Sequence, residues 1–127
     1  MSVSDEELYL LAFIIDWEAN GESYEGKLAV ANVVLNRVRS SAYPNSISGV
    51  IYQRSQFSGV SDGAGSPSAK FQSRINSGLR SQQCMDAAVE ALSGHNNIGG
   101  YTSFRMISAA NISSMSSYVI IGNHVFH

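Results

Sequence analysis

Glu18 is the residue whose position best suits acid–base chemistry. It lies three residues after Ile15 and seven after Leu11, so in a helix its side chain would continue an apolar stripe. Burial disfavours a charged carboxylate and raises its pKa, which lets a glutamic acid remain a proton donor near neutral pH. A general acid in glycoside cleavage needs this property. The same spacing also fits a structural role, in which the carboxyl group is partly exposed or bonded to nearby backbone.

Three other acidic residues lie close to Glu18 in the sequence. Asp16 is two residues away, roughly 200° around a helix, so the two carboxyl groups cannot flank one bond. Glu22 and Glu25 are nearer candidates for a second carboxylate. Glu22 could instead accept hydrogen bonds from the free backbone donors of the next helix.

Sulfur and imidazole groups offer two rival chemistries. Cys84 begins an apolar helix near His95, as a cysteine amidase or peptidase would require, but it lacks a partner motif. A zinc amidase would use His95, His124 and His127, yet histidines three apart on a strand project to opposite faces, and no CxxC or HExxH spacing is present. We therefore expect neither metal nor cofactor, and expect His124 to order a terminal hairpin.

The helix that must carry Glu18 has a recognisable start. Ser4 followed by Glu7 is the pattern of a capping box, and apolar residues then recur at helical spacing. We expect a helix from Asp5 to Asn20, ended by Asn20 and Gly21 in the left-handed conformation.

A second helix should follow after a short turn and pack against the first as a hairpin. Ser23 supplies its N-terminal cap, and the helix should run from Tyr24 to about Val38 with one apolar face. Polar residues recur on another side, which suggests an internal hydrogen-bond network that orients Glu18 or the loop: Asn32, Asn36 and Arg37.

The remaining chain predicts helices first and strands last. Residues 47–51 should form one or two helical turns, Gly63 to Arg80 a long surface excursion with one helix, and Met85 to Leu92 a third clear helix. Gly122-Asn123 suits a type II′ turn between two strands. We therefore expect one α+β, helix-rich domain over residues 1–127 with a small C-terminal antiparallel sheet.

Composition argues against several function classes. The eight basic residues form no cluster, and the formal net charge is −2, so a nucleic-acid partner is not expected. Residues 1–17 contain no lysine or arginine, so no secretory signal and no membrane insertion are expected. An extracellular substrate would then imply spore deposition, release by lysis or carriage by a phage. The oligomeric state leaves no sequence signal.

The sequence closely resembles the SleB-like (SleB/CwlJ) cell-wall hydrolases, the spore-cortex-lytic type. The resemblance lies in residues 18–22, EANGE, and 24–38, YEGKLAVANVVLNRV, with the segments YPNSI, GVIYQ and QFS following in the family's order. The chain closes on IGNHVF, which is similar to the family's terminal motif. Trp17 departs from the family's small residue, and Gly63 to Arg80 looks longer than the corresponding loop.

The resemblance implies a lysozyme-related catalytic domain that cleaves the MurNAc-GlcNAc backbone of peptidoglycan, with Glu18 as catalytic glutamate. A lytic transglycosylase manages with one such residue, acting as acid and then as base to form a 1,6-anhydro-muramic end. A hydrolytic muramidase, an N-acetylmuramoyl-L-alanine amidase and a non-catalytic glycan-binding domain stay open as alternatives.

Further substrate-binding candidates lie in two segments. Gln56 and Ser58 would offer hydrogen bonds to sugar amides, with Glu22 and His124 nearby, while Phe57 packs as core or as a sugar platform.

In the other segment, Tyr101 and Phe104 would occupy strand positions of opposite facing, with Tyr101 towards the saccharide. Arg105 would pair with a lactyl or peptide carboxylate, or stand as an exposed charge.

Overall fold

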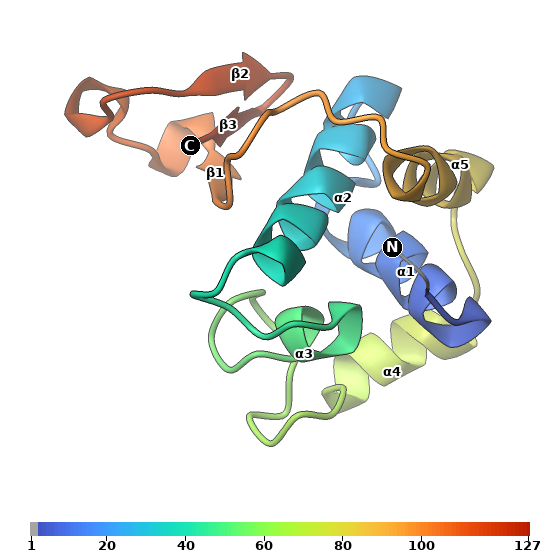
Figure 1. Cartoon of the computed structure of the whole chain (residues 1–127). Coiled ribbons are helices and arrows are strands. Elements are labelled where there is room, and N and C mark those ends of the chain that lie inside the picture. Colours follow the sequence, from blue (N-terminus) through green and yellow to red (C-terminus); the bar gives the residue numbers. More distant parts are fainter. Residues whose placement is uncertain (1–2) are drawn as a thin grey trace.

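A computed structural model describes residues 3–127, which form a group of helices followed by a small sheet (Figure 1). This α+β, helix-rich order is the one predicted. No helix in residues 3–127 has the length and apolar character needed to cross a membrane. The elements are α1 (Asp5–Ala19), α2 (Tyr24–Arg39), α3 (Ile47–Ile51), α4 (Ala69–Asn76), α5 (Gln82–Leu92), β1 (Phe104–Met106), the 3-10 turns η1 (Ile107–Ala109) and η2 (Ile112–Ser114), β2 (Val119–Ile121) and β3 (His124–Phe126).

Helix α1 begins as the sequence predicts but ends differently. Ser4 Oγ accepts from the Glu7 backbone N–H at 3.2 Å, which satisfies one of the free donors of the first turn. At the other end Asn20 keeps right-handed angles, φ −57° and ψ −37°, so the predicted left-handed ending is wrong. The reason is Lys27, whose ammonium donates to the carbonyls of Asn20 and Glu22 and replaces the usual left-handed cap.

Helix α2 lies at the centre of the domain (Figure 1). Every residue from Gly26 to Arg37 is buried, so the prediction of a single apolar face was wrong. Helices α1, α3 and α5 and strand β2 all contact α2, and together they cover its sides. A Cβ at Gly26 would lie 3.0 Å from Glu22 Cβ, so a glycine suits this close approach at the start of the helix.

The excursion from Gly63 to Arg80 is packed against the helical core. Its one helix, α4, was predicted, and Phe71 on that helix is fully buried between the rings of Trp17 and Tyr52, at centroid distances of 5.4 and 6.2 Å. The segment is also tied back by Ser68, whose hydroxyl donates to the Gly59 carbonyl at 2.6 Å.

The far end of the excursion is anchored to α1 through a buried carboxylate. Asp16 is completely buried and accepts from the Arg80 backbone N–H at 2.8 Å and from its Nε at 2.9 Å. Arg74 lies close by, with Nε 3.7 Å from Asp16 Oδ1. The Asp16 side chain was predicted to point in another direction than Glu18. It binds the chain that connects α4 to α5.

The sheet has the order β1-β3-β2 with antiparallel pairing. Gly122 and Asn123 connect β2 to β3 by a two-residue turn, with Gly122 at φ +59° and Asn123 outside the positive-φ region, as a type II′ turn requires. Strand β1 begins only at Phe104, so the prediction that Tyr101 occupies a strand position is wrong. The side-chain amide of Asn36 donates to the backbone carbonyls of Gly99 and Tyr101 and holds that stretch instead.

Candidate functional site

Glu18 lies in the last turn of α1 with its side chain largely removed from water. Desolvation raises its pKa from 4.5 to about 7. Within residues 3–127 no group donates a hydrogen bond to its carboxyl oxygens, so nothing in the protein stabilises the charged form. A neutral carboxyl group with an available proton is thus present at near-neutral pH, as the apolar stripe predicted.

The loop at residues 57–59 is fastened to α1 through Trp17, the residue before Glu18. The indole Nε1 of Trp17 donates to the Ser58 carbonyl at 3.0 Å. Gly59 sits at φ +76°, and a Cβ there would lie 3.3 Å from Trp17 Cζ2, so the close approach of loop and ring favours glycine. The tryptophan that departs from the family pattern therefore holds this loop against the end of α1.

Glu22 fixes the terminal hairpin from across the chain. Its carboxylate accepts from the Asn123 backbone N–H at 2.9 Å and from the Asn123 side-chain amide at 3.0 Å. These two bonds lower the pKa of Glu22. The predicted alternative, in which Glu22 caps the next helix, is wrong because Ser23 Oγ takes that position and accepts from the Gly26 N–H.

An aromatic cluster joins the loop to the sheet. Phe104 packs against Phe57, His124 and Phe126 at centroid distances of 6.4, 5.2 and 5.8 Å. Phe57 is only 4% exposed and packs as part of the core, and its contact with substrate stays a prediction. His124 is buried as well; burial lowers its pKa and favours the neutral imidazole, and its Nδ1 has no partner in the described chain.

The polar face of α2 holds the chain that leads into β1. Arg37 donates to the Thr102 carbonyl at 2.7 Å and to Gln56 Oε1 at 3.2 Å, and its guanidinium lies over the Tyr43 and Phe57 rings. Asn32 likewise donates to the His95 carbonyl. The predicted network exists, but it orients the loops and makes no bond to Glu18.

The structure divides the other predicted binding residues between two cavities. Phe57 and Ser58 line one of about 470 Å³, whereas Tyr101 and Arg105 line another of about 520 Å³ together with Asn111, Ser114, Met115, Ser116, Ser117 and His127. Gln56 is exposed beside Phe57. Tyr101 and Arg105 are therefore not in one cavity with Ser58, and their contact with substrate stays a prediction.

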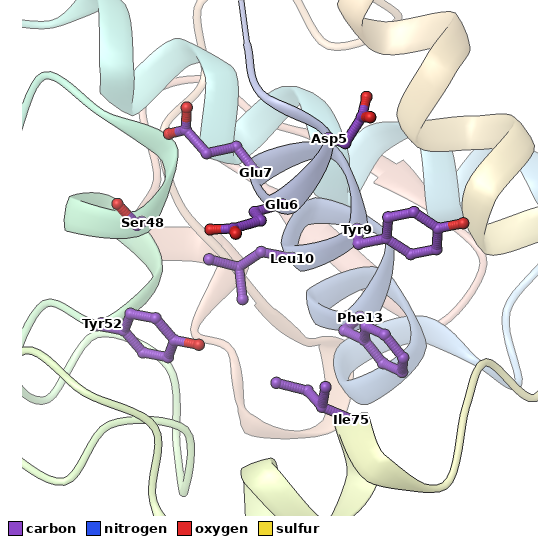
Figure 2. A pocket seen from close by; sticks show the side chains of 9 residues that line it. All are labelled: Asp5, Glu6, Glu7, Tyr9, Leu10, Phe13, Ser48, Tyr52 and Ile75. Atoms are coloured by element: carbon purple, nitrogen blue, oxygen red, sulfur yellow. The ribbon is translucent and has the colours of Figure 1, made fainter.

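The largest of the cavities lies at the opposite end of α1 and does not mark the site of Glu18. It measures about 560 Å³, and Figure 2 shows acidic and aromatic side chains around it. Its lining is Asp5, Glu6, Glu7, Tyr9, Leu10, Phe13, Ser48, Tyr52 and Ile75. The three carboxylates occupy the first turn of α1, where they complement the helix dipole.

The rival chemistries find no support in the geometry. Cys84 is fully buried, and this burial raises its pKa, which disfavours the nucleophilic thiolate. His95 is exposed and bonds Glu90 rather than Cys84. Residues 3–127 contain no cluster of three or more His, Cys, Asp or Glu side chains that could hold a metal ion.

One contact of the site escaped the sequence interpretation. Glu22 and Asn123 are 101 positions apart, and neither a helical nor a strand period connects them. The glycine at position 122 is the one hint of this contact in the sequence. A Cβ there would lie 2.5 Å from Glu22 Oε1, so Gly122 serves both the turn and the close approach of the Glu22 carboxylate.

We expect Gly122→Ala to weaken this contact. The methyl group meets Glu22, and an L-residue at φ +59° is strained, so the free energy of unfolding should fall by about 1–2 kcal/mol. Chemical denaturation measures this change. Gly63→Ala is the matched control, because Gly63 also has a positive φ but no atom within 4 Å of an added Cβ. An equal loss in both variants would contradict a specific role for the Glu22 contact.

Curated relatives with extended similarity are spore cortex-lytic enzymes. The one from Halalkalibacterium halodurans is 33% identical over 126 residues, which cover 97% of this chain and 35% of that protein. The one from Bacillus subtilis is 47% identical over 60 residues, covering 47% of this chain and 20% of that protein. The chain thus spans about a third or less of the length of these relatives.

Two solved structures share the whole fold. The catalytic domain of the germination-specific lytic transglycosylase SleB from Bacillus anthracis superposes with a TM-score of 0.78 at 27% identity, covering 98% of this chain and 96% of that one. The catalytic domain of Bacillus cereus SleB gives a TM-score of 0.80 at 28% identity, covering 98% and 91%.

The family model described as Cell Wall Hydrolase matches residues 21–127. The match begins just after Glu18, and it includes Glu22, the 57–59 loop and the hairpin. With this match over most of its length, the chain belongs to the cell wall hydrolase family.

Proposed function

We propose that this chain is a peptidoglycan-cleaving lytic transglycosylase domain in which Glu18 acts first as acid and then as base. The observation that carries the proposal is the desolvated Glu18 carboxyl, whose pKa of about 7 keeps a proton available near neutral pH. Similarity to the SleB catalytic domain from Bacillus anthracis, itself described as a lytic transglycosylase, supports the reaction class.

The surroundings of Glu18 favour a mechanism with one carboxyl group. Hydrolysis with retention or inversion normally requires a second carboxylate beside the scissile bond. Asp16 is buried against Arg80, and both carboxylate oxygens of Glu22 accept from Asn123. Glu25 is exposed in the first turn of α2 and remains the acidic neighbour with free oxygens. The two carboxylates nearest in sequence are thus committed to structure.

The reaction then proceeds in two proton transfers. Glu18 gives its proton to the bridging oxygen as the bond from that oxygen to muramic C1 breaks, and the N-acetyl oxygen supports the electron-poor carbon. The Glu18 carboxylate next removes the proton of the C6 hydroxyl, whose oxygen bonds to C1 and closes the anhydro ring. The protonated acid is restored, and no water is consumed.

Mass spectrometry of the products tests this assignment. Digestion of purified walls and of spore cortex should release fragments with 1,6-anhydro-muramic ends. Reducing muramic ends would show a hydrolytic muramidase, and free stem peptides with intact glycan would show an amidase. Either of these results would overturn the transglycosylase proposal.

We expect kcat/KM to fall as the pH rises above about 7. The acid must carry its proton, and the protonated fraction of Glu18 decreases tenfold per pH unit above its pKa of about 7. Initial rates of turbidity loss from pH 5 to 9 at constant ionic strength measure this limb. A fall that begins near pH 4.5 would mean that Glu18 titrates as an ordinary exposed carboxyl.

A further inference from the structure

Most of the basic side chains are engaged within the protein. Arg74 and Arg80 form ion pairs with Asp16, and Arg37 donates hydrogen bonds to Thr102 and Gln56. Lys27 donates to backbone carbonyls and Arg39 to Asn36. Of the eight Lys and Arg residues, three form no hydrogen bond or ion pair with the described chain: Arg54, Lys70 and Arg105.

Arg54 lines a cavity in the loop that Trp17 holds. The cavity measures about 470 Å³, and Phe57 and Ser58 also line it. Ser58 is the residue whose carbonyl holds Trp17, the immediate neighbour of Glu18. The remaining lining consists of short side chains, half of them polar: Ser55, Gly59, Ser61, Asp62, Gly63 and Ala64.

The walls of this cavity are held in place before any ligand binds. Asp62 Oδ1 accepts from the backbone N–H groups of Ala64 and Ser66 at 2.7 and 3.1 Å, which ties one oxygen of that carboxylate into its own loop. Ser68 N–H donates to the Val60 carbonyl at 2.7 Å. Ser55 is held at φ +64°, a strained conformation for a residue with a Cβ. The loop therefore presents Arg54 on a fixed frame.

We propose that this cavity is a subsite for a carboxylate of the peptidoglycan, with the Arg54 guanidinium as its partner. A guanidinium binds a carboxylate through two parallel N–H donors, and nearby serine hydroxyls add donors of their own. Peptidoglycan supplies carboxylates on the muramic lactyl group and on stem peptides. This inference rests on the proposed function, since it places part of the same substrate in this cavity.

Equilibrium binding in the inactive Glu18→Gln background tests the subsite independently of cleavage. We expect Arg54→Gln to weaken binding to soluble peptide-bearing glycan strands about tenfold, and Arg54→Lys to weaken it less because charge remains while the two-donor geometry is lost. Lys70→Gln removes the same charge from α4, lines none of the cavities described above and should bind as its parent does.

Chemically altered strands identify the carboxylate. On strands whose carboxyl groups have been converted to amides, the difference between Arg54 and Arg54→Gln should vanish. A tenfold effect on peptide-free strands assigns the lactyl group, and an effect confined to peptide-bearing strands assigns the stem. Equal binding by Arg54→Gln and Lys70→Gln, or an effect that persists on amidated strands, would overturn the subsite.

Kinetics in the active protein separates the two proposals. Arg54→Gln should raise KM about tenfold and leave kcat nearly unchanged, because Arg54 acts on binding and not on proton transfer. If Arg54→Gln still releases anhydro products and its KM equals that of the wild type, the subsite alone is contradicted. Loss of the expected products in the wild type, with Arg54-dependent binding intact, would contradict the catalytic proposal alone.

Discussion

Replacing Glu18 with glutamine should reduce kcat on purified walls by about a thousandfold, because the amide has no proton to donate to the bridging oxygen. The substitution keeps the size and shape of the side chain, so substrate binding should persist. Turbidity loss and release of anhydro-muramic fragments measure the effect. Glu25→Gln is the matched control: this glutamate is exposed in α2, and the variant should keep wild-type activity.

Two outcomes would contradict this assignment. Full activity in Glu18→Gln would show that another group supplies the proton. Equal loss in Glu18→Gln and Glu25→Gln would instead show a pair of carboxyl groups, and with it a hydrolytic mechanism.

The same substitution should also stabilise the protein, and the effect depends on pH. Folding raises the pKa of Glu18 from 4.5 to about 7, so the folded state holds the proton more tightly. Below pH 4.5 the acid is neutral in both states and carries no ionisation penalty. Between pH 4.5 and 7 the unfolded chain gives up this proton while the folded state keeps it, so stability falls; above pH 7 the folded state bears a desolvated charge at a cost of about 3 kcal/mol. Glutamine avoids that cost.

Urea denaturation of both proteins at pH 4 and pH 8 measures this difference. The free energy of unfolding of Glu18→Gln relative to wild type should increase between the two pH values. A constant difference would show that the Glu18 carboxyl is solvated in the folded protein, and the acid role would lose its physical basis.

Asp16→Asn should cost about 3 kcal/mol of stability, because it removes a buried negative charge. The Arg80 backbone N–H and Nε donate to this carboxylate, and Arg74 Nε lies close to Oδ1. The new amide NH₂ would face the donors of Arg80 at a site with no exposed surface, and an unsatisfied buried donor is costly. Urea denaturation at pH 7 measures the loss. Asp86→Asn, on the exposed surface of α5, should change the free energy of unfolding by less than about 0.5 kcal/mol.

A small effect at Asp16 would contradict the role of this carboxylate as an anchor of the chain between α4 and α5. Activity provides a second readout. Because the Asp16 carboxylate is bonded to Arg80 and makes no hydrogen bond with Glu18, the folded fraction of Asp16→Asn at low temperature should keep the wild-type pH profile.

Local patterns predicted those features that depend on neighbouring residues. Ser4 and Ser23 cap their helices as expected, Gly122 forms the predicted turn, and the apolar stripe correctly directed Glu18 away from water. Each of these depends on hydrogen bonds or packing within a few residues, and such patterns carry that information.

The features that were missed depend on contacts between distant segments. The burial of α2 on every side follows from the helices and strand that surround it, and no periodicity within α2 encodes their arrival. The partner of Glu22 lies 101 positions away, and the ending of α1 depends on Lys27 in the next helix. Tyr101 was predicted to occupy a strand position, whereas the Asn36 side chain of α2 holds its backbone in a loop.

The bond between Glu22 and Asn123 also affects when the site is completed during synthesis. Glu22 leaves the ribosome about a hundred residues before the turn at Asn123 that it binds. A growing chain therefore contains Glu18 while the terminal hairpin has not yet been made. Closing so long a loop is slow compared with forming α1 and α2. The acid is therefore made early, and the hairpin that Glu22 holds is joined to the helices last.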